Sequence, residues 1–229
     1  MDQQVVHKSR TERTCDMLRD DIVCARYLPG EKLRIDQLGK TLDASSGAVR
    51  EALSRLTAEG LVLAQPQRGF IVAPISRKEL QDLTDVRIDI ECRCLADSIE
   101  NGDLDWEGRV LSLQHRLRAL EDVINAPSSP NAQQWHALHY QFHEELTSAC
   151  QNIWWQRLRQ QLYIQSERYR RLSAPGDETH RNVTAEHDAI ANAALARDAV
   201  SAAKHMQDHL QTTTEILLNS KLPFTDTDA

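Results

Sequence analysis

The sequence predicts a mainly α-helical protein in two parts: three helices with a β-hairpin, followed by a six-helix antiparallel bundle. Up to residue 61, apolar residues recur at helical spacing, and from there to residue 72 they alternate as in strands. After residue 76 the strand pattern nearly vanishes, and short breaks separate six helical stretches. We therefore expect two domains, residues 1–75 and 76–229.

Three helices are expected in the first domain, beginning with the amphipathic stretch 11–26. The next two have apolar residues at helical spacing: Leu33, Ile35, Leu38 and Leu42, and then Val49, Leu53, Leu56 and Leu61. Ser45 is placed to cap the third helix, and Gly60 stands where that helix should end. The hairpin follows, with Leu61 and Leu63 before a turn at residues 65–69 and Phe70 and Val72 after it.

This order of elements is the outline of a winged helix-turn-helix, whose second helix of the pair enters the major groove of DNA. Arginines stand on that helix and at the tip of the hairpin, where phosphates and base edges would be met. The candidate DNA contacts are Arg34, Ser45, Ser46, Arg50, Arg55, Arg68 and Gly69. The alternative is a domain that binds no nucleic acid, in which these arginines are ordinary solvated side chains.

Three segments closely resemble the GntR family of bacterial transcription regulators: LPGEKL at 28–33, VREALSRL at 49–56 and EGLV at 59–62. The resemblance covers roughly residues 10–75. It implies a DNA-binding regulator, and we expect a repressor that acts as a homodimer on double-stranded DNA. Two-fold protein symmetry requires an inverted-repeat operator. Many members carry Arg and Pro in the turn where this chain has Ser46, Gly47 and Ala48, so one expected cation is missing.

The charge distribution agrees with DNA binding by the first domain alone. The chain has a net charge of −7, with 27 basic and 34 acidic residues. Residues 1–75 hold 11 of the basic and 10 of the acidic residues, so the remainder carries −8 and should point away from DNA. A nearly neutral DNA-binding domain binds weakly alone, which again favours two copies acting together.

No signal peptide or transmembrane span is visible, because the N-terminus is polar and no long apolar run follows. We therefore expect a cytoplasmic protein without a membrane partner. The five cysteines lack metal-type spacing and are expected to be thiols.

Six helices are expected in the second domain, each ended by a short polar, Gly-containing or Pro-containing break. They cover approximately residues 76–100, 106–124, 133–149, 153–172, 179–194 and 198–220.

Eight of the nine histidines lie in this second domain. His139 and His143 stand four residues apart, as do His205 and His209, so each pair shares one helix face. Such a pair, joined by single histidines from two other helices, can build a metal site inside a bundle. The alternative is solvated or core histidines without a metal, and spacing alone favours it.

Residues 76–229 resemble the all-helical effector-binding domain of the FadR-type branch of the family, the FCD domain. The resemblance rests on FHEEL at 142–146, Glu186–His187 and MQDHL at 206–210. It implies that a carboxylate and three histidines hold a metal ion beside a small carboxylate effector.

The three family histidines match His143, His187 and His209, while His139 stands where the family usually has Asp. Four imidazoles suit a divalent transition metal, and we expect zinc or nickel. Because the switch from Asp to His removes a negative charge, occupancy and metal identity stay open.

An anionic effector needs cationic partners, and a guanidinium binds a carboxylate through two parallel hydrogen bonds. Arg87 lies in a segment that resembles a family signature on the first bundle helix, and Arg168 and Arg170 are the next candidates. The alternatives are a surface ion pair of Arg87 with Glu91, and plain surface positions for the other two.

The rival function is a metalloenzyme that acts on a small organic acid at the histidine site. It requires an acid or base beside an open coordination position. The best candidate, Glu186, comes directly before His187 on the same helix and so points about 100° away from it. An enzyme leaves the first domain unexplained, and a protein-interaction module explains neither the basic hairpin nor the histidines. We therefore expect a regulator with no catalytic residue.

Overall fold

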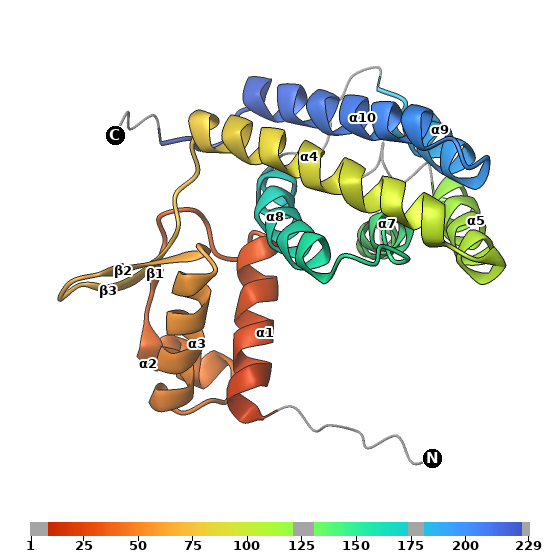
Figure 1. Ribbon diagram of the computed structural model, residues 1–229. Coiled ribbons are helices and arrows are strands. Elements are labelled where there is room, and N and C mark those ends of the chain that lie inside the picture. The colour runs from red at the N-terminus through yellow and green to blue at the C-terminus, as the bar shows by residue number, and fades with distance from the viewer. Residues whose placement is uncertain (1–8, 121–130, 174–180, 226–229) are drawn as a thin grey trace, which may run out of the picture. The chain divides into compact units, whose positions relative to one another are not determined.

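The computed structural model describes residues 9–120, 131–173 and 181–225 (Figure 1). These residues form two compact units. The first comprises the chain up to Arg77, the segment Glu167–Leu172 and the C-terminal segment from Pro223. The second comprises Lys78–Ser166 and Ser173–Leu222. Both units are mainly helical, which confirms the predicted fold class.

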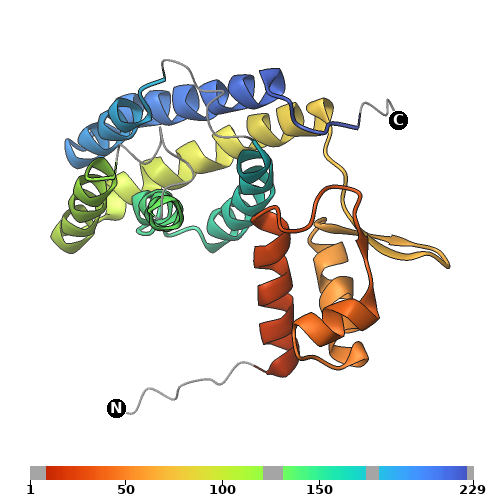
Figure 2. The same cartoon turned by 180° about the vertical axis from the view of Figure 1, so that it is seen from behind.

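The first unit contains three helices and a small antiparallel sheet. The helices are α1 (Arg10–Val23), α2 (Ile35–Thr41) and α3 (Ser46–Ala58). The strands are β1 (Lys32–Leu33), β2 (Val62–Gln65) and β3 (Gly69–Val72), in the order β1-β3-β2. Figure 2 shows the β2–β3 hairpin extending from the three helices as a wing.

Helix α3 begins and ends where the sequence predicts. The Oγ of Ser45 accepts a hydrogen bond from the backbone N of Ala48 at 3.2 Å, which caps the helix. Gly60, with φ +76°, reverses the chain in the left-handed region that favours glycine. The inner face of α3, with Val49, Leu53 and Leu56, is completely buried.

Two details of the prediction for this unit are wrong. Leu33 is the buried residue of strand β1 and pairs with Phe70, so α2 starts only at Ile35. In the wing, Leu61 and Val62 are both buried while Leu63 is exposed. Leu61 precedes β2 and bonds to the backbone of neighbouring segments, so it does not share the strand alternation.

Six described helices build the second unit, in agreement with the predicted bundle. They are α4 (Arg77–Asn101), α5 (Leu104–Arg118), α7 (Ala132–Leu146), α8 (Ile153–Leu172), α9 (Val183–Leu195) and α10 (Ala199–Asn219). The last residues of α8, Glu167–Leu172, belong to the first unit. Helices α4 and α10 lie side by side in Figures 1 and 2. A hydrogen bond of 2.7 Å between the hydroxyls of Thr84 and Thr214 joins them.

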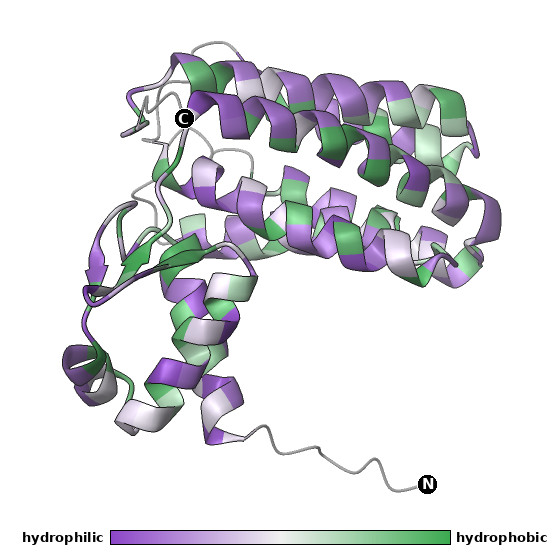
Figure 3. Cartoon of the chain, turned by 60° about the vertical axis from the view of Figure 1, so that its left-hand side comes forward, coloured by the Kyte–Doolittle hydropathy of each residue, from purple (hydrophilic) through white to green (hydrophobic). Residues whose placement is uncertain are grey.

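The core of this unit gathers apolar residues from these helices, including Leu95, Trp106, Phe142, Ile190 and Met206. Figure 3 shows hydrophobic and hydrophilic residues alternating along the helices, the pattern of amphipathic helices around a core. Helix α5 starts two residues earlier than predicted because Asp103 caps it, and the predicted continuation to residue 124 reaches beyond the described residues. None of the described helices combines the length and apolarity needed to cross a membrane.

Candidate functional site

The exposed side of α3 presents the first group of candidate residues. Arg50 and Ser46 are one helical turn apart, and both are exposed. Arg50 has no ion-pair partner among the described residues, whereas Arg55 pairs with Glu51 at 2.5 Å. Both side chains of this ion pair are exposed, so the pair contributes little stability. Arg55 therefore remains available to another anion.

The wing turn holds Arg68 and Gly69. Gln67 and Gly69 have φ of +60° and +92°, and the N of Arg68 donates to the carbonyl of Gln65 at 3.0 Å. This turn leaves Arg68 exposed at the tip. Gly69 permits the turn, because a side chain there would be strained although no atom stands in its way. Arg34 is exposed directly before α2.

The second unit brings the four candidate histidines together. His139 and His143 come from α7, His187 from α9 and His209 from α10. One ring nitrogen of each lies within 4.8 Å of the nitrogens of the other three, and all four residues are buried. Spatial proximity of this kind follows from packing of three helices and is the arrangement that a metal ion requires.

His143 is the member whose environment points most directly to a missing ligand. It is 1% exposed, and neither of its ring nitrogens has a hydrogen-bond partner among the described residues. Buried polar groups are normally satisfied. Burial lowers the pKa of His143 well below its usual range, and the neighbouring His209 and His187 add to this effect. The ring is therefore neutral, the form that binds metals.

His139, the departure from the family pattern, is held by an aromatic neighbour. Its ring stacks on Trp135 at 4.8 Å between centroids with 25° between planes, and its centroid lies 4.6 Å from that of His143. His205, the other member of the second spaced pair, is exposed and does not belong to the cluster.

A carboxylate touches the cluster from outside. Oε2 of Glu186 lies 2.8 Å from Nδ1 of His209, and Arg181 donates to both oxygens of Glu186. Burial raises the pKa of Glu186, but hydrogen bonds from Arg181 and His209 outweigh it and lower the pKa to about 2. Glu186, predicted to point away from its neighbour His187, contacts a different histidine of the cluster, His209. Sequence reasoning missed Arg181 entirely.

Arg87 pairs with Glu91, with 3.9 Å between Nε and Oε2, as the alternative expects, but both side chains are buried, so only the surface position is wrong. Its Nη1 donates to the Oγ of Ser166 at 2.6 Å, and its guanidinium lies 5.1 Å from the ring centroid of Tyr163. Its charge also contributes to lowering the pKa values of His143 and His209, after the larger effect of burial.

A second buried arginine was not predicted. Nε of Arg159 donates to Glu91 at 3.0 Å, its Nη2 donates to the carbonyl of His143 at 2.7 Å, and its Nη1 pairs with Glu144. Helix α8 is thereby tied to α4 and to the α7 segment that carries the cluster. Glu91, the partner of Arg87 in the alternative interpretation, also pairs with Arg159, at a shorter distance of 3.0 Å.

Arg168 and Arg170 make other contacts, in the first unit. Nη2 of Arg168 donates to the carbonyls of Ala73 and Pro74, each at 3.0 Å, and the side chain is buried. Arg170 forms two hydrogen bonds with Glu167. The expectation of a plain surface position is thus wrong for Arg168, whose guanidinium binds two backbone carbonyls, and the guanidinium of Arg170 is engaged by Glu167.

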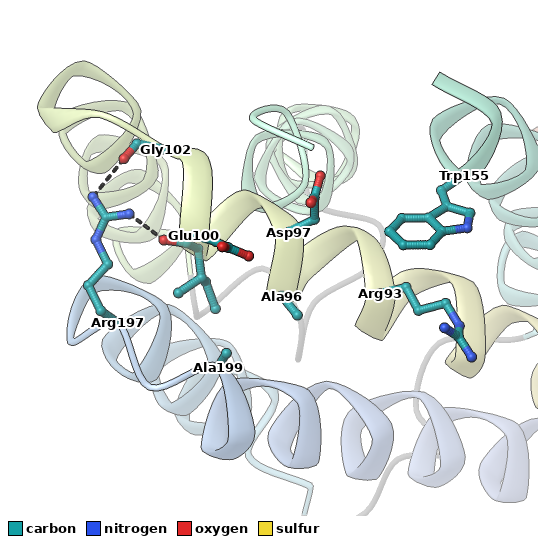
Figure 4. Close-up of a pocket in the computed structure, with 9 residues that line it drawn as sticks. Arg93, Ala96, Asp97, Glu100, Gly102, Trp155, Arg197 and Ala199 are labelled. Atoms are coloured by element: carbon teal, nitrogen blue, oxygen red, sulfur yellow. Dashed lines mark hydrogen bonds between the residues drawn. The ribbon is translucent and has the colours of Figure 1, made fainter. Parts of the chain in front are cut away.

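A surface groove of ≈ 780 Å³ lies elsewhere in the second unit (Figure 4). It is lined by Arg93, Asp97, Glu100, Trp155 and Arg197, among others. The Nη2 of Arg197 donates to the carbonyl of Gly102 at 2.8 Å, and Asp97 accepts from the backbone N of Gln151. The groove contains none of the predicted site residues.

The buried neutral rings predict a pH-dependent stability of the metal-free protein. The pKa values of His143 and His209 are lower in the folded protein than in the unfolded chain. Below about pH 6.5 these two histidines therefore bind protons in the unfolded chain but stay neutral in the folded protein. The free energy of unfolding should then decrease as the pH falls. The slope is at most about 1.4 kcal/mol per pH unit for each histidine. Urea unfolding in the presence of a chelator measures it. His143→Gln should flatten the slope and the exposed His205→Gln should not; equal slopes would contradict a buried neutral ring.

Both units match known families. Residues 10–72 match the family described as bacterial regulatory proteins, gntR family, and residues 82–212 match the FCD domain. The chain is 42% identical over 210 residues to the uncharacterized HTH-type transcriptional regulator BphR of Paraburkholderia xenovorans (strain LB400), covering 92% of this chain and 86% of the relative. It is 33% identical over 204 residues to the HTH-type transcriptional repressor GlaR of Escherichia coli (strain K12), covering 87% and 92%.

Solved structures share the fold. Escherichia coli McbR/YncC superposes with a TM-score of 0.77 at 18% identity, covering 92% of this chain and 98% of the other. A putative transcriptional regulator GntR from Rhodococcus sp. RHA1 gives a TM-score of 0.73 at 23% identity, with the same coverage.

Proposed function

The chain belongs to the GntR family of bacterial regulatory proteins and is a DNA-binding transcription regulator with an FCD domain, and from this membership we propose that it is a repressor controlled by a small carboxylate. The carboxylate binds in the second domain beside a divalent transition metal. The observation that carries this proposal is the cluster of His139, His143, His187 and His209.

The donor set fits a metal of the zinc or nickel type. Four buried imidazoles supply four nitrogen ligands, and His143 has no hydrogen-bond partner among the described residues to occupy its ring nitrogens. When bound, the ion supplies a positive charge that no neutral histidine provides, and this charge attracts an anion.

Arg87 is the cation of this chain that we assign to the effector. It is buried, its charge acts on His143 and His209, and a guanidinium suits a carboxylate. Arg168 and Arg170 were expected to assist, but their contacts with Ala73, Pro74 and Glu167 support a structural role instead.

For DNA we propose a homodimer on an inverted repeat, with α3 in the major groove and the wing beside it. Arg50 contacts a base edge or phosphate, and Arg55 contacts the backbone. Arg68 contacts the adjacent minor groove. Arg34, Ser45, Ser46 and Gly69 complete the contact surface. The exposure of these residues and the absence of an ion pair on Arg50 among the described residues support this assignment.

The metalloenzyme alternative is not favoured. The relatives are transcription regulators, and the carboxylate nearest the histidines, Glu186, is held by Arg181 against a histidine ring.

A thermal-shift screen tests the sensor role. The metal-loaded protein is titrated with small mono- and dicarboxylates, and the effector should raise the melting temperature, since a hundredfold excess over Kd adds about 2.7 kcal/mol of stability. The shift should disappear in Arg87→Met, while the exposed Arg109→Met, which pairs with Glu145, should keep it. If no carboxylate shifts the loaded protein, the effector belongs to another chemical class.

A further inference from the structure

A charged pair, Arg181 and Glu186, lies beside His209. Arg181 donates to Glu186 from Nε to Oε1 at 2.8 Å and from Nη2 to Oε2 at 2.6 Å. The same guanidinium donates to the carbonyl of His209 at 3.1 Å and to Oγ1 of Thr213 at 3.0 Å. Its side chain is 7% exposed, so this arrangement is largely shielded from water.

These contacts fix the direction of the hydrogen bond between Glu186 and His209. A carboxylate that pairs with an arginine is ionised and can only accept. At 2.8 Å, Nδ1 of His209 must therefore carry the proton and donate it to Oε2 of Glu186. The 3.3 Å approach of Arg181 Nη2 to the same nitrogen is then not a hydrogen bond, because both atoms would be donors.

The tautomer determines which nitrogen of His209 is left for a ligand. A neutral imidazole protonated at Nδ1 has its lone pair at Nε2. Since Glu186 occupies Nδ1, Nε2 is the atom that His209 offers to the cluster with His139, His143 and His187. A carboxylate in this position also makes the opposite nitrogen a stronger donor.

We propose that Glu186, held in place by Arg181, is a positioning residue that sets the tautomer and ring orientation of His209 for metal binding. This inference rests on the proposed metal site. Loss of such an outer carboxylate costs about 10-fold to 100-fold in metal affinity. His143 has no equivalent partner among the described residues. Its tautomer and ring orientation are therefore not fixed by a hydrogen bond from this part of the chain, unlike those of His209.

Zinc affinity of the full-length chain tests the proposal. The protein is stripped with a chelator, and its Kd for Zn²⁺ is measured by competition with a chromogenic chelator. Glu186→Gln should weaken binding by about 10-fold to 100-fold. The matched control is Asp208→Asn: Asp208 is also next to a cluster histidine in sequence, but it is exposed and pairs with Lys204, so its loss should leave Kd within about twofold.

A second readout needs no metal. In histidine-labelled, metal-free protein, ¹⁵N NMR should show His209 protonated at Nδ1, and Glu186→Gln or Arg181→Gln should mix the tautomers, a change that a purely structural loss of stability would not produce. If wild type binds zinc and Glu186→Gln equals Asp208→Asn in both readouts, the positioning role is refuted while the metal site stands. If wild type binds no zinc, the proposed metal site fails and the inference fails with it.

Discussion

Replacing His143 and His187 together with alanine is expected to remove bound metal from the protein. Each side chain contributes one of the four nitrogens that lie within 4.8 Å of one another, and they come from different helices. Loss of an outer partner alone weakens metal binding by about 10-fold to 100-fold, so loss of two direct ligands should exceed 100-fold. Mass spectrometry of metal content after purification measures the effect directly.

The control for this substitution is His205→Ala. His205 lies on α10 with His209 but is exposed, so its variant should retain the full metal content. The double variant should also lose the response to the carboxylate effector in the thermal-shift assay. Equal metal content in the double variant and wild type would place the metal elsewhere or show that the bound metal is adventitious.

The second large effect is expected for Arg50→Ala, which should abolish specific operator binding. A good bidentate contact to a base contributes about 1–3 kcal/mol, or roughly 5-fold to 150-fold in affinity. A two-fold symmetric dimer carries the residue twice, and well-separated contacts are nearly additive, so the combined loss is roughly the square of that factor. Fluorescence anisotropy with an operator selected from genomic fragments gives the Kd at fixed salt.

Arg50 is exposed and supports no described contact of the fold, so the variant should melt like wild type. Arg13→Ala removes another exposed cation, on α1 and outside the predicted contact surface, and should change affinity little. Unchanged operator affinity in Arg50→Ala would refute the assignment of α3 as the reading helix.

The parts of the fold that depend on local patterns were predictable. The Ser45 cap, the end of α3 at Gly60 and the six bundle helices each follow from a few neighbouring residues. The strand β1 was not predictable, because a two-residue strand has no periodicity of its own. Leu33 enters it through pairing with Phe70, which is 37 positions away.

In the candidate site too, the residues with a local sequence pattern were predictable and those that depend on contacts distant in the sequence were not. Spacing indicated two pairs, His139 with His143 and His205 with His209, and the family resemblance singled out His143, His187 and His209. The supporting charges could not be found this way, because Arg159 meets Glu91 across 68 positions and Arg181 lies before its helix rather than at a helical interval. For Arg168, the arginine-rich sequence gave no sign that two carbonyls at the end of the wing segment would satisfy its guanidinium.

The last turns of α8 limit how the N-terminal DNA-binding segment of this protein can be exchanged for that of another. Its residues Glu167–Leu172 belong to the same compact unit as the N-terminal 77 residues, where Arg168 satisfies the carbonyls of Ala73 and Pro74 and Tyr169 is buried. A fusion that exchanges only the N-terminal segment would leave this arginine facing foreign backbone. A DNA-binding unit taken from another protein therefore has to be compatible with the last turns of α8. The simplest chimera exchanges the N-terminal segment and these last turns together.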